Sequence, residues 1–122
     1  MSTPKFAPFA QGIFYLGTGL WPIVHLRSFE KVTGPKVDTW LVRTLGGLIA
    51  AVGAALVVGS FDEKPSRGLA VLGIGSAVAL GLADVIFASR GRISKAYYGD
   101  AAAEAGVVAS WVIAHKGVRW KN

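Results

Sequence analysis

Residues 44–61 read TLGGLIAAVGAALVVGSF and contain no Asp, Glu, Lys or Arg. Residues 68–83 read GLAVLGIGSAVALGLA and are also free of charge, and the apolar run continues beyond Asp84 to Ala88. A helix that crosses a bilayer needs roughly 20 predominantly apolar residues, whereas a surface helix of a soluble bundle carries one charged face. Both stretches are apolar all round, so they predict membrane-spanning helices.

Two further runs flank this central pair. Residues 6–26 carry no charged side chain, and residues 96–114 are mostly apolar but include Asp100 and Glu104. Helices satisfy every backbone polar group within their own segment, so they are the open-chain solution in lipid. Short connections make successive helices antiparallel neighbours. We predict an all-α, single-domain integral membrane four-helix bundle over residues 1–122, with spans at about 9–27, 39–60, 67–89 and 95–116.

The overall composition agrees with a lipid environment. The chain is 52% hydrophobic and 16% charged, against about 25% charged residues in a typical soluble domain. The net charge of +6 would suggest nucleic acid in a soluble protein. Here the basic residues lie at the ends of apolar runs, where anionic lipid head groups attract them. We therefore expect the lipid bilayer as the partner, and no nucleic acid.

Small residues recur at every fourth position of three predicted spans. In membranes this spacing lets helix backbones approach closely. The pattern fits helix packing, and it fits equally a groove for a flat ligand such as a pigment or quinone. The residues are Gly47, Ala51, Ala55 and Gly59; Gly73, Ala77 and Gly81; and Ala101, Ala105 and Ala109.

Three acidic residues lie within the predicted spans: Asp84, Asp100 and Glu104. An ionisable group there costs about 2.5–3.5 kcal/mol on insertion scales, so it normally faces the interior and has a partner. Asp100 and Glu104 are four residues apart and therefore share one helix face. Tyr97, Trp111 and His115 extend the same face, which predicts a polar and aromatic stripe along the last helix.

Helix positions place these acids at one end of the bundle. At 1.5 Å per residue, Asp84 and Asp100 lie roughly 7–8 Å from the same membrane face, and His25 and Arg43 lie near that face too. We predict a polar, aromatic-lined pocket at this face. The predicted ligand-binding residues are Asp84, Asp100, Glu104, Arg43, His25, Tyr97, Trp21 and Trp111.

This convergence has two interpretations. Arg43 could neutralise one or two carboxylates in a structural salt bridge that fixes helix register. Alternatively, three carboxylates against one arginine leave an excess of negative charge in a low dielectric, which suits a cation, an amine or a transferable proton. The segment from Glu30 to Asp38 is either a solvated turn or a cap over the pocket mouth.

Motifs for catalysis or metal binding are missing from the sequence. His25 and His115 lie at opposite faces, about 30 Å apart, so they cannot share a metal or haem, although either alone could be an axial ligand of a pigment. The sequence has no His-Glu-x-x-His motif and no recognisable hydrolase triad, and it contains no cysteine. We predict no catalytic residues and no metal site, and the cofactor, if any, stays unknown.

One stretch carries a family resemblance. Trp21-Pro22, the run FEKVTGPK at residues 29–36 and the following Trp40-Leu41-Val42 resemble a group of small bacterial four-span proteins without assigned function. In size and layout the chain also resembles the DoxX-like four-helix membrane proteins. The resemblance implies a bacterial inner-membrane protein and transfers no catalytic residue.

Three functions are compatible with these patterns. The first is a membrane protein whose acidic pocket binds or passes a small amphipathic or cationic molecule or a proton. One copy encloses little volume, so transport would require a homo-oligomer. The second is an accessory or structural subunit of a larger respiratory or photosynthetic membrane complex, which binds partner helices, lipid or pigment. The third, and least supported, is an enzyme that uses an acid pair on a lipid-soluble substrate.

Overall fold

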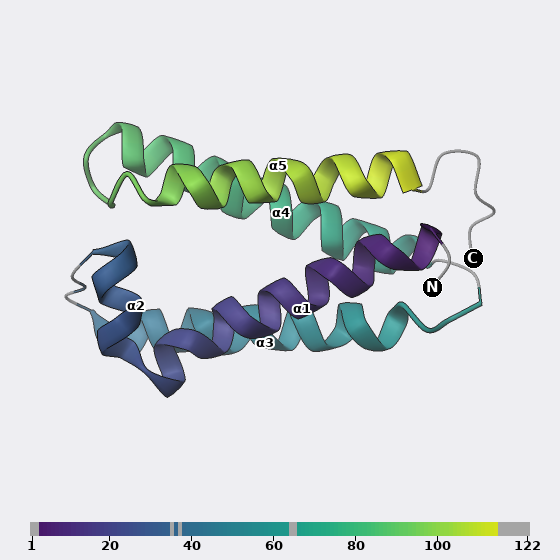
Figure 1. Ribbon diagram of the computed structural model, residues 1–122, viewed down its shortest axis with the longest axis horizontal. Helices are drawn as coiled ribbons and strands as arrows, with labels where there is room; N and C mark the ends of the chain where they lie inside the picture. The colour runs from purple at the N-terminus through teal and green to yellow at the C-terminus, as the bar shows by residue number, and fades with distance from the viewer. Residues whose placement is uncertain (1–2, 35, 37, 64–65, 115–122) are drawn as a thin grey trace.

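The computed structural model describes residues 3–34, 36, 38–63 and 66–114. In these segments the chain folds into helices that are joined by short connections. The predicted all-α class is confirmed. The helices are α1 (Thr3–Val24), α2 (Leu26–Thr33), α3 (Thr39–Gly59), α4 (Arg67–Ser89) and α5 (Tyr97–Ala114), as Figure 1 shows. The four long helices coincide with the four predicted intervals to within a few residues at most ends, although α1 begins six residues earlier. The short helix α2 lies where the sequence predicted only a connection.

Side-chain caps and a glycine define both ends of α2 and the start of α4. The His25 Nδ1 atom accepts a hydrogen bond from the Ser28 backbone N–H and so caps the start of α2. Gly34 then ends α2 with a φ of 98°, which a residue with a side chain rarely adopts. Ser66 caps α4 through a bond from the Leu69 N–H to its hydroxyl.

The long helices form two antiparallel hairpins. Figure 1 shows α1 packed along α3, and α4 packed along α5. The two hairpins meet at the end that holds the first half of α1, and they diverge toward the end that holds α2. Although residues 60–66 join α3 to α4, these two helices make few contacts with each other. Successive long helices were expected to pack against each other as antiparallel neighbours. This holds within each hairpin, whereas α3 and α4 make little contact.

The core lies at the narrow end, where the hairpins meet. It consists of Ala7, Tyr15, Leu56, Ala70 and Trp111, contributed by α1, α3, α4 and α5. A Cβ atom built on Gly73 would lie 2.6 Å from the Trp111 ring. The indole of α5 therefore packs directly on the α4 backbone. Because this contact needs a residue without a side chain, Gly73 lets α4 and α5 approach closely at this end.

Backbone contact also joins α1 to α3. A Cβ atom built on Gly12 would lie 2.7 Å from the Gly53 carbonyl oxygen, and one built on Gly19 would lie 2.6 Å from the Ala50 nitrogen. The buried stripe of α3 is Gly46, Ala50, Gly53 and Leu56. Of the predicted stripe, Ala51 and Ala55 are exposed, whereas a Cβ atom on Gly59 would lie 2.7 Å from the Leu69 side chain of α4. The contact with α1 therefore uses a stripe displaced from the predicted one by about one residue of helix rotation. The two glycines of α1 select the adjacent stripe, and spacing within α3 alone could not show that choice.

The other two small-residue stripes had different outcomes. In α4, Gly73 and Ala77 are buried, as predicted. In α5, Ala101 is half-buried, whereas Ala105 and Ala109 are exposed, so most of the predicted stripe on this helix faces away from the described part of the chain. The face of α5 that carries Glu104 and Trp111 packs inward instead, because these large side chains fill the space that the glycines of α4 leave.

The outer surface is strongly apolar. Helices α3 and α4 are long and apolar enough to cross a membrane, and only 22% of the most apolar window of each is buried. Many large hydrophobic side chains are exposed on them, including Leu48 on α3 and Val71, Val78 and Leu82 on α4. The length and the apolar surface of these two helices are thus weak evidence for a membrane location.

We expect Gly12→Ala to destabilise the fold by about 1–3 kcal/mol, because the new methyl group must push α1 away from the α3 backbone. The measurement is thermal unfolding of the protein in mild detergent. Gly17→Ala is the matched control, since a Cβ atom there would meet nothing within 4 Å. A Gly12→Ala protein that is as stable as the control would contradict the glycine contact between α1 and α3.

Candidate functional site: an acidic pocket between the hairpins

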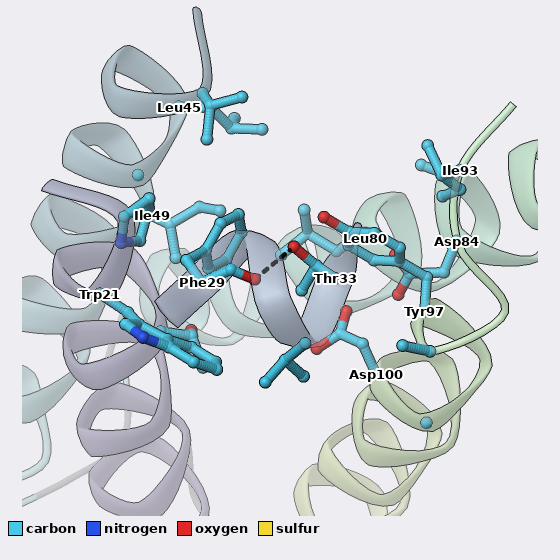
Figure 2. Close-up of a pocket in the computed structure, with 18 of the residues that line it drawn as sticks. Trp21, Phe29, Thr33, Leu45, Ile49, Leu80, Asp84, Ile93, Tyr97 and Asp100 are labelled. Atoms are coloured by element: carbon cyan, nitrogen blue, oxygen red, sulfur yellow. Dashed lines mark hydrogen bonds between the residues drawn. The ribbon is translucent and has the colours of Figure 1, made fainter. Parts of the chain in front are cut away.

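A pocket of about 550 Å³ fills the wide end of the molecule, between the two hairpins. All five helices contribute to its lining. Figure 2 shows Trp21 and Ile49 on one side, Asp84 and Tyr97 on the other, and Phe29 of α2 between them. At the opposite end Gln11 of α1 bonds Gly73 of α4 and Trp111 of α5 and so joins the two hairpins, whereas the space between them at the wide end forms the pocket.

Three carboxyl groups gather on the α4–α5 side of this pocket. Asp84 is 6% exposed and Glu104 is 2% exposed, whereas Asp100 is half-buried. All three acids line the pocket. A Cβ atom on Gly81 would lie 3.4 Å from the Glu104 Cβ atom, so a small residue one turn before Asp84 lets the two helices bring the acids together.

Tyr15 of α1 connects the opposite hairpin to this cluster. Its hydroxyl group donates a 2.6 Å hydrogen bond to Glu104 Oε1. One turn earlier on α1, Gln11 Nε2 donates to the Gly73 carbonyl at 2.8 Å, and Gln11 Oε1 accepts from Trp111 Nε1 at 2.6 Å. Tyr15 and Gln11 were not among the residues predicted for the site. Their polar groups within a charge-free run were the available signal.

Asp84 has an oxygen without a partner. Within the described part of the chain, Asp84 Oδ2 is a buried side-chain oxygen that makes no hydrogen bond. Buried polar atoms in folded proteins are nearly always hydrogen-bonded, so an exception needs an explanation. Asp84 also lines the pocket. Asp84 thus combines a place in the pocket lining with a buried oxygen that lacks a hydrogen-bond partner.

Aromatic side chains and a lysine surround the mouth. The Trp21 and Phe29 rings meet edge to face with centroids 5.4 Å apart, and Trp21 Nε1 donates to Ser28 Oγ at 2.8 Å. The Lys36 Nζ atom lies 4.8 Å from the centre of the Tyr97 ring and 5.8 Å from that of Phe29. Lys36 thus links the segment after α2 to α5 by a cation–π contact. Of the segment from Glu30 to Asp38, which was expected to be either a solvated turn or a cap, Val32, Thr33 and Lys36 line the pocket, whereas Glu30 and Asp38 do not.

The structure brings together five of the eight predicted ligand-binding residues. Those that line the pocket are Asp84, Asp100, Glu104, Tyr97 and Trp21. Trp111 is buried at the narrow end, two turns beyond Glu104, and does not line the pocket. The predicted face of α5 is therefore continuous, but its far part belongs to the core. His115 lies outside the described residues.

Arg43 and His25 do not join the acids. Both side chains are exposed and neither lines the pocket. Helix α3 directs Val42, Leu45, Gly46 and Ile49 to the pocket, which turns Arg43 to another face. The His25 side chain serves as the cap of α2. Among the described residues Arg43 forms no ion pair with these carboxylates, so its expected convergence with them is wrong.

Lys36, not Arg43, is the basic residue of the pocket lining. It hydrogen-bonds the Thr33 carbonyl at 3.0 Å through Nζ, and Glu30 Oε2 accepts from its backbone N–H. Within the described segments, no group of three or more His, Cys, Asp or Glu side chains is arranged to hold a metal ion. The lining thus combines three acids, one lysine whose ammonium group lies over two aromatic rings, and a wall that is mostly apolar.

We expect Tyr15→Phe to lower the free energy of unfolding by about 1–3 kcal/mol, because it removes a buried hydroxyl donor from Glu104 without changing the ring. Tyr98→Phe is the matched control, since the Tyr98 hydroxyl shares an exposed 2.9 Å hydrogen bond with Ser89 and should contribute little. Thermal unfolding in one detergent compares them. Equal stability of the two variants would argue that the Tyr15–Glu104 bond does not join the hairpins.

No protein-family model matches the chain, and no curated protein or solved structure is significantly similar to it. We therefore infer the function from the geometry of the pocket.

Proposed function

We propose that this is a bacterial inner-membrane protein in which α1, α3, α4 and α5 all span the bilayer, and whose pocket binds or passes a small amphipathic molecule with a cationic group. The observation that carries the ligand proposal is the buried, unpartnered oxygen of Asp84, a residue that lines a pocket with a mostly apolar wall. As part of the same proposal, the protein is related to the small bacterial four-span proteins and shares the layout of the DoxX-like proteins, both of which its sequence resembles.

Helix length and surface character support four spans. With 22 and 18 residues, α1 and α5 are about 33 and 27 Å long, close to the roughly 30 Å of a bilayer's hydrocarbon core. They lie alongside α3 and α4, whose apolar surfaces are mostly exposed. A core helix of a soluble protein would have this surface buried. Lipid would cover it in the proposed arrangement.

The chemistry of the pocket favours an organic cation. Its volume of about 550 Å³ falls in the range of roughly 300–1,000 Å³ typical of small-molecule sites. Trp21, Phe29 and Tyr97 supply aromatic surface for an apolar body. Asp84, with Asp100 beside it, supplies the negative end that an ammonium group needs. No cation from the described part of the chain pairs with these acids.

The exposed parts of the lining indicate how a ligand enters. Leu45 of α3 and Phe87 of α4 both line the pocket and are 48% and 41% exposed. Because α3 and α4 make few contacts with each other, these side chains stand at an opening between the hairpins. In the proposed bilayer this opening faces acyl chains, so the ligand would arrive from the lipid phase.

A role as an accessory subunit of a larger membrane complex is the second candidate. The observation that favours it is the outward face of α5, where Ala105, Gly106 and Ala109 are exposed. Such small residues would let a partner helix approach closely. Copurification of a large complex after mild solubilisation would favour this candidate over a free pocket protein.

The spans can be tested by cysteine labelling, because the native chain has no cysteine. Glu63→Cys and Arg92→Cys lie in the connections at opposite ends of the helices. In sealed vesicles of one orientation, we expect a membrane-impermeant maleimide to label only one of them, and both after permeabilisation. Val78→Cys, within α4 and 44% exposed, should resist labelling. Equal labelling of all three in intact vesicles would exclude the spanning arrangement.

Ligand binding can be tested with 1-naphthalenemethylamine and its neutral analogue 1-naphthalenemethanol. We expect the amine to raise the melting temperature more than the alcohol, because only the amine can pair with Asp84. Asp84→Asn should weaken amine binding at least tenfold, or about 1.4 kcal/mol, and leave alcohol binding unchanged. Asp62→Asn, in the exposed connection after α3, is the control for loss of charge. Equal affinity of the Asp84→Asn and Asp62→Asn proteins for the amine would contradict the proposed site.

A further inference from the structure

The ammonium group of Lys36 lies against two aromatic rings of the pocket lining. Its Nζ atom is 4.8 Å from the centre of the Tyr97 ring of α5 and 5.8 Å from that of the Phe29 ring of α2. All three residues line the pocket and are half-buried. A cation within about 6 Å of a ring centre is attracted to the face of the ring, most strongly where water is excluded. The two rings therefore form a place in the pocket where a positive charge is stabilised.

The end of α2 adds a hydrogen-bond acceptor to these rings. Lys36 Nζ donates to the Thr33 carbonyl at 3.0 Å, and Thr33 is the last residue of α2. The last carbonyl groups of a helix lack partners within the helix and carry the negative end of its dipole, so they favour a cation. Figure 2 shows Phe29, Thr33 and Tyr97 in the pocket. Below, the two rings and the Thr33 carbonyl are together called the ammonium cage.

The way the chain leaves α2 brings Lys36 to this cage. Gly34 ends the helix with a φ of 98°, and the Lys36 backbone N–H then donates to Glu30 Oε2 at 2.8 Å. The backbone of Lys36 is thus fixed beside the last turn of α2. From this position its side chain reaches the cage, so the protein places one of its own ammonium groups in the pocket.

The cage and the pocket acids share one wall. Tyr97 precedes Asp100 by three residues on α5, so the two side chains lie on the same helix face. Both line the pocket together with Asp84. Within the described part of the chain, the Lys36 ammonium group contacts the cage and pairs with no carboxylate. A ligand is not tethered to the segment after α2, so its ammonium group can lie against the rings and near the acids at once.

We propose that the ammonium cage is part of the site for the cationic group of the ligand, and that Lys36 occupies the cage as a built-in competitor until an organic ammonium group displaces it. This inference rests on the proposed function, because it concerns the same pocket and the same class of ligand. No covalent bond changes. The ligand gains the rings and the attraction of the acids, whereas Lys36 gives up the rings alone and returns to water.

Substitution of Lys36 tests the competition. Lys36→Met keeps an unbranched side chain but removes the ammonium group, so 1-naphthalenemethylamine no longer has to displace it. We expect the amine to bind this variant about fivefold more tightly than the native protein, which is the value of one cation–π contact of about 1 kcal/mol. The neutral 1-naphthalenemethanol should bind both proteins equally. Isothermal titration calorimetry in one mild detergent measures the affinities, and Lys36→Gln replaces Lys36→Met if that variant does not fold.

Lys31→Met is the matched control for the loss of one positive charge. Lys31 also lies on α2, but it is exposed and does not line the pocket. We expect the Lys31→Met protein to bind the amine as the native protein does. A gain as large as that of Lys36→Met would show that overall charge governs the affinity, and it would overturn the role of the cage.

A double-mutant cycle with Tyr97 locates the competition at the ring. Tyr97→Leu removes the closer of the two rings, so Lys36 has less to compete for. We expect Lys36→Met to strengthen amine binding by less than about twofold when it is made in the Tyr97→Leu protein. A gain that stays near fivefold would overturn the cage. Phe29→Leu provides the same cycle at the second ring if Tyr97→Leu does not fold.

The outcomes separate this inference from the proposed function. Suppose that the native protein binds the amine and that Asp84→Asn weakens this binding, but that Lys36→Met does not strengthen it. The competition by Lys36 is then overturned and the proposed function stands. If neither the native nor the Lys36→Met protein binds the amine, or if Asp84→Asn leaves the binding unchanged, the proposed function itself is overturned.

Discussion

The pocket depends on the contact between the two hairpins at one end of the molecule. There Gln11 of α1 bonds both the Gly73 carbonyl of α4 and the Trp111 indole of α5, and Trp111 packs directly on Gly73. Because these contacts lie at the narrow end only, α3 and α4 diverge toward the other end. The space between them becomes the pocket, and the packing that stabilises the fold also determines where a ligand can enter.

Glycine and acid have complementary roles in this arrangement. Small residues let helix pairs pack through their backbones, which is how helices associate where no water drives them together. The same close approach between α4 and α5 at Gly81 brings Asp84 of α4 toward Asp100 and Glu104 of α5. Tyr15 then joins the acids to the other hairpin. Packing thereby holds in one place a group of acids whose burial is unfavourable in isolation.

Several features of the site could be read from the sequence, and others could not. Asp100 and Glu104 are four apart on one helix, so their shared face followed from helical geometry. The approach of Asp84 followed from its place near the end of the neighbouring helix. The position of Arg43 did not follow, because a rotation of α3 by about one residue decides whether it faces the acids. The same rotation moved the α3 contact stripe from Gly47 and Ala51 to Gly46 and Ala50.

The sequence by itself determined the number, length and apolar character of the long helices, since these follow from local composition and from the period of the helix. It also determined which acids lie within them. The tertiary structure alone decided how each helix is rotated, that residues 26–33 form a helix over the pocket, and that Lys36 and Tyr15 belong to its lining. These depend on contacts between residues far apart in the chain, such as Gly12 with Gly53, and no local pattern encodes which of several similar small-residue stripes will meet.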